Sequence, residues 1–443
     1  MITSACTAAP TMHKTFTPSN HQWLLRIVQV LLTLILLIKL AGFFTWSEDV
    51  GLTRIFKTGS RLAMTLAAAG VSQWLQRRGA VAAWRWQHSL AVLLYGAYLL
   101  LGLASLLWSG NPGYSLLQLL MVVETLVFAY FYAQCFVLLD TFYQGSNIHF
   151  ARVVGNACFW LVLGFLVGAV AAPDTFYRLT HGGEEARLGG FMMNPNELGM
   201  LCVVGASCLS FNFYQKYRLR RTLLQLLPLV VALVLTGSRS SLAGFGLVLF
   251  FHLRQAGRRW QLLALGGVGA SLPLLAGLVV KQGGLEEVLS LTGRLPFWQA
   301  LLTEGLPREP LLGYGFMRIA YGEYFQSTHT YAAQMTHNTF IQVLLNLGVV
   351  GFGVVLAQLL LLVRGALLSP DRQARLLFVG LLIPLLINSF TEFGIFGQSN
   401  FGILFYQLLI FLTCLRFNPR LTAPERRVLR LRRPDLVLLP AAG

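Results

Sequence analysis

The sequence predicts an all-α polytopic membrane protein with about twelve transmembrane helices. Hydrophobic residues make up 56% of the 443 positions and charged residues only 12%, whereas soluble domains carry about 25% charged residues. The apolar residues also gather into runs near the roughly 20 residues that a helix needs to cross a bilayer. These runs are 23–45, 59–76, 88–108, 113–138, 152–172, 192–213, 222–237, 239–256, 260–281, 337–363, 375–392 and 400–416.

The formal charge of +17 follows a membrane topology pattern. Proteins that bind nucleic acid gather basic residues in a surface patch, whereas membrane proteins cluster Lys and Arg at the cytoplasmic ends of their spans. The pattern therefore predicts cytoplasmic N- and C-termini, a basic cytoplasmic tail over 417–443 and no nucleic-acid partner. The clusters beside the apolar runs are Arg77 with Arg78, 216–221, 254–259, 364–375 and 416–433.

We expect one transmembrane domain over 1–443, because no fixed-period repeat or low-complexity segment divides the chain. One long extramembrane stretch, 282–336, connects the ninth and tenth spans on the side opposite the termini. Its apolar and aromatic residues alternate with charged ones, a pattern typical of short helices at the membrane interface. The alternative, a mobile connector, would leave aromatic side chains such as Trp298 exposed.

Four ionisable residues fall on the non-cytoplasmic side without a topological reason: Arg187, Arg239, Arg294 and His337. The positive-inside bias works against arginine there, so each arginine needs an acidic partner or an anionic ligand. A salt bridge explains any one of them alone. Three arginines together with a histidine favour an anion site.

The starts of three spans strengthen the prediction of an anion site. Even-numbered spans begin on the non-cytoplasmic side in this topology, and unpaired N–H groups at helix N-termini attract anions. The sixth, eighth and tenth spans open at 194–196, 238–241 and 336–338. A diphosphate among these ends would receive bidentate hydrogen bonds from Arg187 and Arg239.

His337 is the best candidate for a general base. At a helix N-terminus the dipole disfavours the imidazolium form, which leaves a neutral ring able to take a proton from a hydroxyl. A structural histidine bonded to backbone is the alternative. Glu124, in mid-span, is expected to be paired with a buried polar group. The rival carboxylate bases near the non-cytoplasmic face are Glu197, Glu304, Glu309, Glu323 and Glu392.

The sequence predicts chemistry without a metal or another cofactor. The acidic residues form no Asp-x-Asp pair, although ligands from separate loops remain an alternative. The six cysteines lack Cys-x-x-Cys spacing, so we expect neither a zinc site nor a disulfide framework.

Several motifs resemble the O-antigen ligase and O-antigen polymerase superfamily. His337-Asn338 precedes Gly348-Val-Val-Gly351 by nine residues, as in the signature that follows the large periplasmic loop of that superfamily. Further motifs occur in the same order: Arg187-Leu-Gly-Gly, Asn194-Pro-Asn-Glu-Leu-Gly199, Ser238-Arg-Ser-Ser-Leu242, Gly293-Arg294 with Trp298, and Pro310-Leu-Leu-Gly-Tyr-Gly315.

This resemblance implies an inverting, metal-independent glycosyltransferase with the C-type membrane fold (GT-C) in the bacterial inner membrane. Its active site would face the periplasm. Arg187 and Arg239 would hold the diphosphate of an undecaprenyl-diphosphate glycan, and His337 would act at the acceptor. Arg294 and Asn338 are grouped with the donor-binding residues, although Gly293-Arg294 would equally serve to fold the loop.

The single large loop, the modest length and the basic tail favour a ligase, which joins O-antigen to the lipid A core. The alternatives are an O-antigen polymerase and a protein O-oligosaccharyltransferase, which use the same donor. A transporter of lipid-linked glycans is a further alternative. Transporters place binding groups near the midplane, whereas the polar residues here gather at one face.

Overall fold

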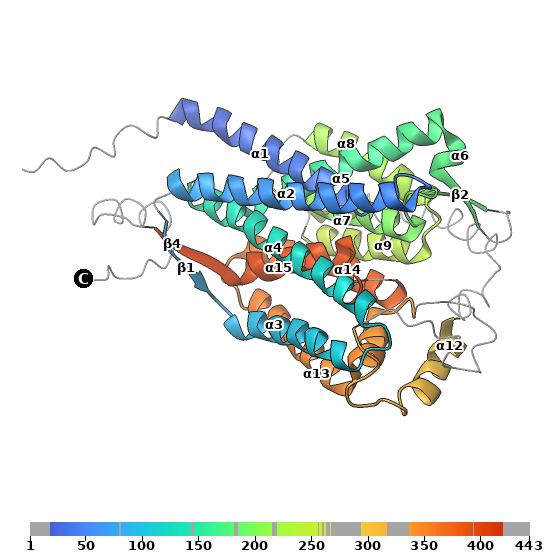
Figure 1. Cartoon of the computed structure of the whole chain (residues 1–443). Helices are drawn as coiled ribbons and strands as arrows, with labels where there is room; N and C mark the ends of the chain where they lie inside the picture. Colours follow the sequence, from blue (N-terminus) through green and yellow to red (C-terminus); the bar gives the residue numbers. More distant parts are fainter. Residues whose placement is uncertain are drawn as a thin grey trace, which may run out of the picture.

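The computed structural model is a bundle of long helices (Figure 1). It describes residues 18–78, 81–142, 146–180, 185–214, 219–255, 294–316, 336–392 and 394–419, together with 257–258, 261–262 and 266.

Eleven of the predicted spans contain a helix, and most of the remaining one, 260–281, lies outside the described residues. The helices of the N-terminal half are α1 (Pro18–Ala41), α2 (Val50–Arg78), α3 (Ser89–Ala104), η1 (Ser105–Leu107), α4 (Pro112–Phe142), α5 (Ser146–Ala171) and α6 (Pro173–Phe176). The helices that follow are α7 (Pro195–Tyr214), α8 (Leu219–Leu235), α9 (Arg239–Leu253), α12 (Arg294–Ala300), η3 (Leu301–Gly305), α13 (Thr339–Leu367), α14 (Arg372–Thr391) and α15 (Phe401–Cys414).

Several of these helices have the length and composition of membrane spans. Six contain a segment apolar and long enough to cross a membrane, and these six are α1, α13, α14 and the helices from α3 to α5. Helices α9 and α15 are apolar but shorter. The fold is therefore that of a polytopic membrane protein, while twelve crossings and the GT-C fold stay predictions.

Two small antiparallel sheets depart from the predicted all-α fold. Strand β1 (Val81–Trp86) pairs with β4 (Leu415–Pro419), and β2 (Tyr177–Thr180) pairs with β3 (Glu185–Leu188). The predicted tail over 417–443 thus begins inside a strand. These connectors pair because a backbone that leaves a helix must satisfy its N–H and C=O groups elsewhere. The two sheets lie at opposite ends of the bundle, and we call these the β1–β4 end and the β2–β3 end (Figure 1).

A cluster of charges lies inside the bundle between α1, α2 and α4. The Glu124 carboxylate forms ion pairs with Lys39 and with Arg61, whose Nη2 is 2.9 Å from Oε2 of Glu124. Thr65 donates a hydrogen bond of 2.6 Å to the other carboxylate oxygen. We call Lys39, Arg61 and Glu124 the core ion cluster. The expectation that Glu124 is paired is confirmed.

The glycine of the Gly348-Val-Val-Gly351 motif allows the loop before α13 to pack against this helix. Gly348 has φ 64°, and a Cβ there would lie 2.1 Å from the Leu311 carbonyl oxygen. The 310–315 segment is bound by backbone hydrogen bonds of 2.9 Å from Val349 to Pro310 and from Tyr314 to Leu345. Two motifs of the resemblance therefore form one packed unit that holds the start of α13.

Candidate active site

The predicted site residues come together at the β2–β3 end. Arg187 lies on β3, and Arg239 and Arg294 are the first residues of α9 and α12. His337 precedes α13, and Glu392 directly follows α14. The ends of elements far apart in the sequence thus bring their charged side chains to one place.

Glu392 is the centre of the cluster. Its Oε2 lies 2.8 Å from Nδ1 of His337, and its Oε1 accepts hydrogen bonds of 3.0 Å from Nη2 of Arg294 and 2.7 Å from Nδ2 of Asn196. The side chain is only 3% exposed. Burial raises the pKa of Glu392, but the hydrogen bonds and charges of His337 and Arg294 outweigh it and hold this pKa below its ordinary value. The carboxylate is therefore ionised at neutral pH.

Arg187 is fixed by two acceptors. Its Nε donates to the Thr236 carbonyl oxygen at 2.7 Å, and its Nη2 donates to Oδ1 of Asn196 at 2.7 Å. Asn196 therefore links Arg187 to Glu392. Burial lowers the pKa of Arg187, and Glu185 and Glu392 oppose this shift. Arginine remains charged at any physiological pH.

Arg239 adds a second cation beside Arg187. Its charge adds to the effect of burial in lowering the pKa of the Arg187 guanidinium. Ser238 caps α9 by accepting the backbone N–H of Ser241. Gly199 permits the close approach of α7 to this turn, because a Cβ there would lie 2.6 Å from Oγ of Ser241.

Arg294 brings the described part of the long loop onto the bundle. Its guanidinium donates to the Thr391 carbonyl oxygen as well as to Glu392. Four residues later, Nε1 of Trp298 donates a hydrogen bond of 2.6 Å to the Thr336 carbonyl oxygen. Helix α12 is thereby fixed beside His337. The predicted loop boundaries, 282–336, extend beyond the described residues.

His337 and Asn338 have different roles at the start of α13. Oδ1 of Asn338 caps the helix by accepting the N–H groups of Phe340 and Ile341 at 3.0 and 3.1 Å. His337 has φ 49°, a left-handed conformation that is uncommon for residues other than glycine. This turn directs the imidazole toward Glu392. The donor-binding role of Asn338 stays a prediction, because its side-chain oxygen serves as the cap.

The sequence did not identify the partner of His337. Glu392 was one of five rival carboxylates, and Asn196 was expected only as part of a helix start. The helix dipole was the only electrostatic influence expected at His337, whereas its Nδ1 lies 2.8 Å from the Glu392 carboxylate. The sequence feature that could have identified Glu392 is its position as a single acidic residue at the end of an apolar run.

No group of three or more His, Cys, Asp or Glu side chains suited to a metal occurs among the described residues. The partners of Glu392 are cationic or amide groups. Metal independence itself stays a prediction.

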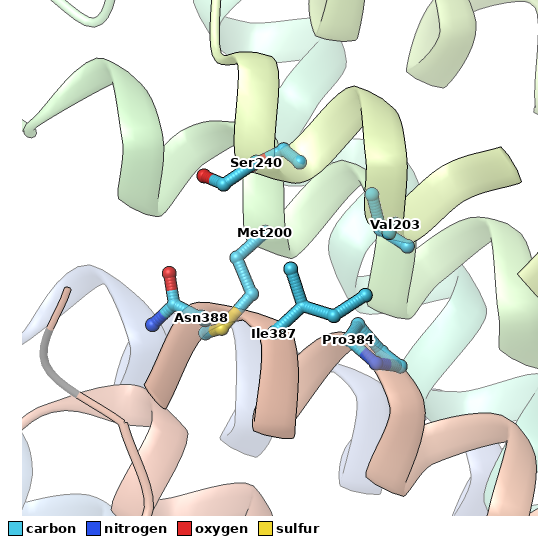
Figure 2. A pocket seen from close by; sticks show the side chains of 8 residues that line it. Met200, Val203, Ser240, Pro384, Ile387 and Asn388 are labelled. Carbon is cyan, nitrogen blue, oxygen red and sulfur yellow. The ribbon is translucent and has the colours of Figure 1, made fainter. Parts of the chain in front are cut away.

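A small cleft lies between α7, α9 and α14, close to the site along each helix (Figure 2). Figure 2 shows Met200 and Ile387 lying between the helices, with Ser240 and Asn388 as polar groups of the lining. The lining residues are Met200, Val203, Ser240, Ser241, Gly244, Pro384, Ile387 and Asn388.

The family model described as Wzy_C, O-Antigen ligase, matches residues 223–356. This match supports the predicted resemblance to the O-antigen ligase family. The matched segment contains Arg239, Arg294 and His337, whereas Arg187 and Glu392 lie on either side of it. No curated protein matches the chain. This family indicates an enzyme of the ligase or polymerase type that acts as a glycosyltransferase on lipid-linked glycans.

Proposed function

We propose that the protein is an O-antigen ligase, which transfers O-antigen polysaccharide from undecaprenyl diphosphate to the lipid A core oligosaccharide. One observation carries the proposal: two arginines and a histidine converge on Glu392 and Asn196 in a chain that matches the O-antigen ligase family. The reaction takes place at the periplasmic face of the bacterial inner membrane, with both termini in the cytoplasm.

Arg187 and Arg239 bind the donor diphosphate. Guanidinium groups pair bidentately with phosphate oxygens, and the N-terminus of α9 adds its partial positive charge. Arg294, at 16% exposure of its side chain, is accessible from the same side. The undecaprenyl chain remains in the membrane lipid around the helices.

His337 acts as the base toward the acceptor. A hydroxyl of the lipid A core gives its proton to the imidazole while its oxygen bonds to the anomeric carbon of the glycan. The bond from that carbon to the diphosphate breaks, and its electron pair leaves with the phosphate oxygen. The arginines stabilise the charge that grows on this oxygen. Attack from the face opposite the diphosphate inverts the anomeric centre, and no metal or cofactor takes part.

A transfer assay with competing acceptors tests this function. The purified protein is given an undecaprenyl-diphosphate glycan with lipid A core, with a second donor molecule or with an acceptor protein, each with and without EDTA. A product on lipid A core that survives EDTA supports the ligase. Elongated lipid-linked glycan identifies a polymerase, and a glycosylated protein identifies an oligosaccharyltransferase. No product in any mixture, with movement of the donor across vesicles, identifies a transporter.

A further inference from the structure

The Glu392 carboxylate contacts three groups that the proposed function uses in different ways. One oxygen faces His337, and the other receives hydrogen bonds from Arg294 and from Asn196, which also binds Arg187. We propose that Glu392 is a positioning residue, which fixes the tautomer of His337 and its placement relative to the donor arginines. This inference rests on the proposed function of the site.

The tautomer follows from the chemistry of the contact. An ionised carboxylate only accepts hydrogen bonds, so Nδ1 of His337, 2.8 Å from Oε2, carries the proton and donates it. The lone pair of the neutral ring is then on Nε2, the nitrogen that takes the acceptor proton. After transfer, the imidazolium faces a buried anion that stabilises it.

Glu392 is not itself the base. Its two oxygens already receive three donors, and its side chain is only 3% exposed. His337 and Arg294 hold its pKa below the ordinary value against the effect of burial, so the carboxylate is a weak base at neutral pH. His337, at 20% exposure, is the member of the pair that can meet an acceptor.

Other charges face this pair from three elements. Arg294 on α12 is cationic and helps to keep Glu392 ionised. Arg187 on β3 is a second cation that interacts with the charge of Glu392. Glu197 on α7 is close enough to feel the negative charge of Glu392. Glu197 therefore supplies a matched control, since it is a second carboxylate in the same surroundings that is not needed for the tautomer of His337.

The substitution Glu392→Gln tests the inference. A glutamine amide can donate to Nδ1, which places the ring proton on Nε2 and removes the base. We expect kcat at saturating donor to fall on the order of 10²- to 10⁴-fold. Glu197→Gln removes a second acid from the same end of the bundle without altering the contact to Nδ1 of His337, so we expect a smaller loss of kcat than for Glu392→Gln.

A double-mutant cycle separates positioning from general damage. If Glu392 acts through His337, adding Glu392→Gln to His337→Ala causes no further loss of kcat. Thermal unfolding of each purified variant shows that it is folded. An equal loss with Glu197→Gln, or an additive loss in the double variant, would overturn the inference.

A readout without turnover keeps this inference distinct from the proposed function. The ¹⁵N spectrum of the histidine-labelled protein, assigned with His337→Ala, reports which ring nitrogen is protonated. We expect the proton on Nδ1 in the wild type and on Nε2 in Glu392→Gln. The opposite tautomer in the wild type would contradict the inference even if the protein transfers glycan, and failed transfer with the expected tautomer would contradict the proposed function alone.

Discussion

Two carboxylates in this protein each pair with two basic side chains, yet their surroundings differ. In the core ion cluster, Lys39 is 0% exposed and Arg61 is 5% exposed. At the site, the partners of Glu392 are 16% and 20% exposed. The basic partners are enclosed by the bundle in the core ion cluster and are partly exposed at the site, although Glu124 at 15% is itself more exposed than Glu392 at 3%.

The chemistry of the partners differs as well. Glu124 is bound by a lysine and an arginine and also by the Thr65 hydroxyl, so its charges are satisfied within the protein. Glu392 has His337 as one partner, and an imidazole ring can act as a general base. A cluster with buried basic side chains serves the fold, whereas an accessible cluster with a histidine member is suited to proton transfer.

The largest expected effect on activity comes from His337→Ala. Loss of a general base lowers the transfer rate on the order of 10²- to 10⁴-fold, while the fold is preserved. The matched control is His252→Ala, which removes a buried histidine next to the Ser207 hydroxyl, 3.1 Å away. We expect this control to lower thermal stability but to leave the rate of the folded enzyme within a fewfold. Equal activity of His337→Ala and wild type would exclude His337 as the general base.

A substitution in the core ion cluster is expected to lower the stability of the protein. Glu124→Gln leaves Lys39 and Arg61 without their carboxylate, and breaking a buried ion pair costs about 3–5 kcal/mol. We expect a lower melting temperature in detergent and a near-normal turnover per folded molecule. If turnover falls as steeply as in His337→Ala with an unchanged melting temperature, the cluster has a catalytic role and the comparison fails.

A smaller effect, on the KM for the donor, is expected from substitution of one of two arginines on the β2–β3 hairpin. Arg178 and Arg187 are paired across the strands, but Arg178 is exposed and Arg187 binds Thr236 and Asn196. Hydrogen bonds to charged groups contribute about 1.5–3 kcal/mol, so Arg187→Ala should raise the donor KM roughly 10- to 100-fold. Arg178→Ala should leave it nearly unchanged. Similar KM values for both variants would argue against donor binding by Arg187.

The smallest effect is the pH dependence of stability. The folded pKa of Glu392 lies below its ordinary value of 4.5, so its contribution to stability is present above pH 4.5 and is lost as the pH falls through the folded pKa. Melting temperatures measured from pH 6 downward should therefore decline more in wild type than in Glu392→Gln. Parallel curves would show that the carboxylate does not stabilise the fold.

The helices of the bundle were predictable because runs such as 339–367 are apolar over the length that a bilayer requires. The sheets were not, because β1 and β4 pair across more than 300 residues and neither has a long alternating pattern. The three site arginines and His337 were predicted from the sequence because the topology places them on the non-cytoplasmic side, where the positive-inside bias disfavours basic residues. Glu392 was not singled out, since only the folded chain brings the end of α14 to the start of α13.

The most direct test of the central claim is a cryo-electron microscopy structure of the protein in nanodiscs with undecaprenyl diphosphate. We expect the diphosphate within hydrogen-bonding distance of Arg187 and Arg239, with Nε2 of His337 on the same side and Nδ1 on Glu392. A diphosphate bound at the core ion cluster or away from the β2–β3 end would contradict the account.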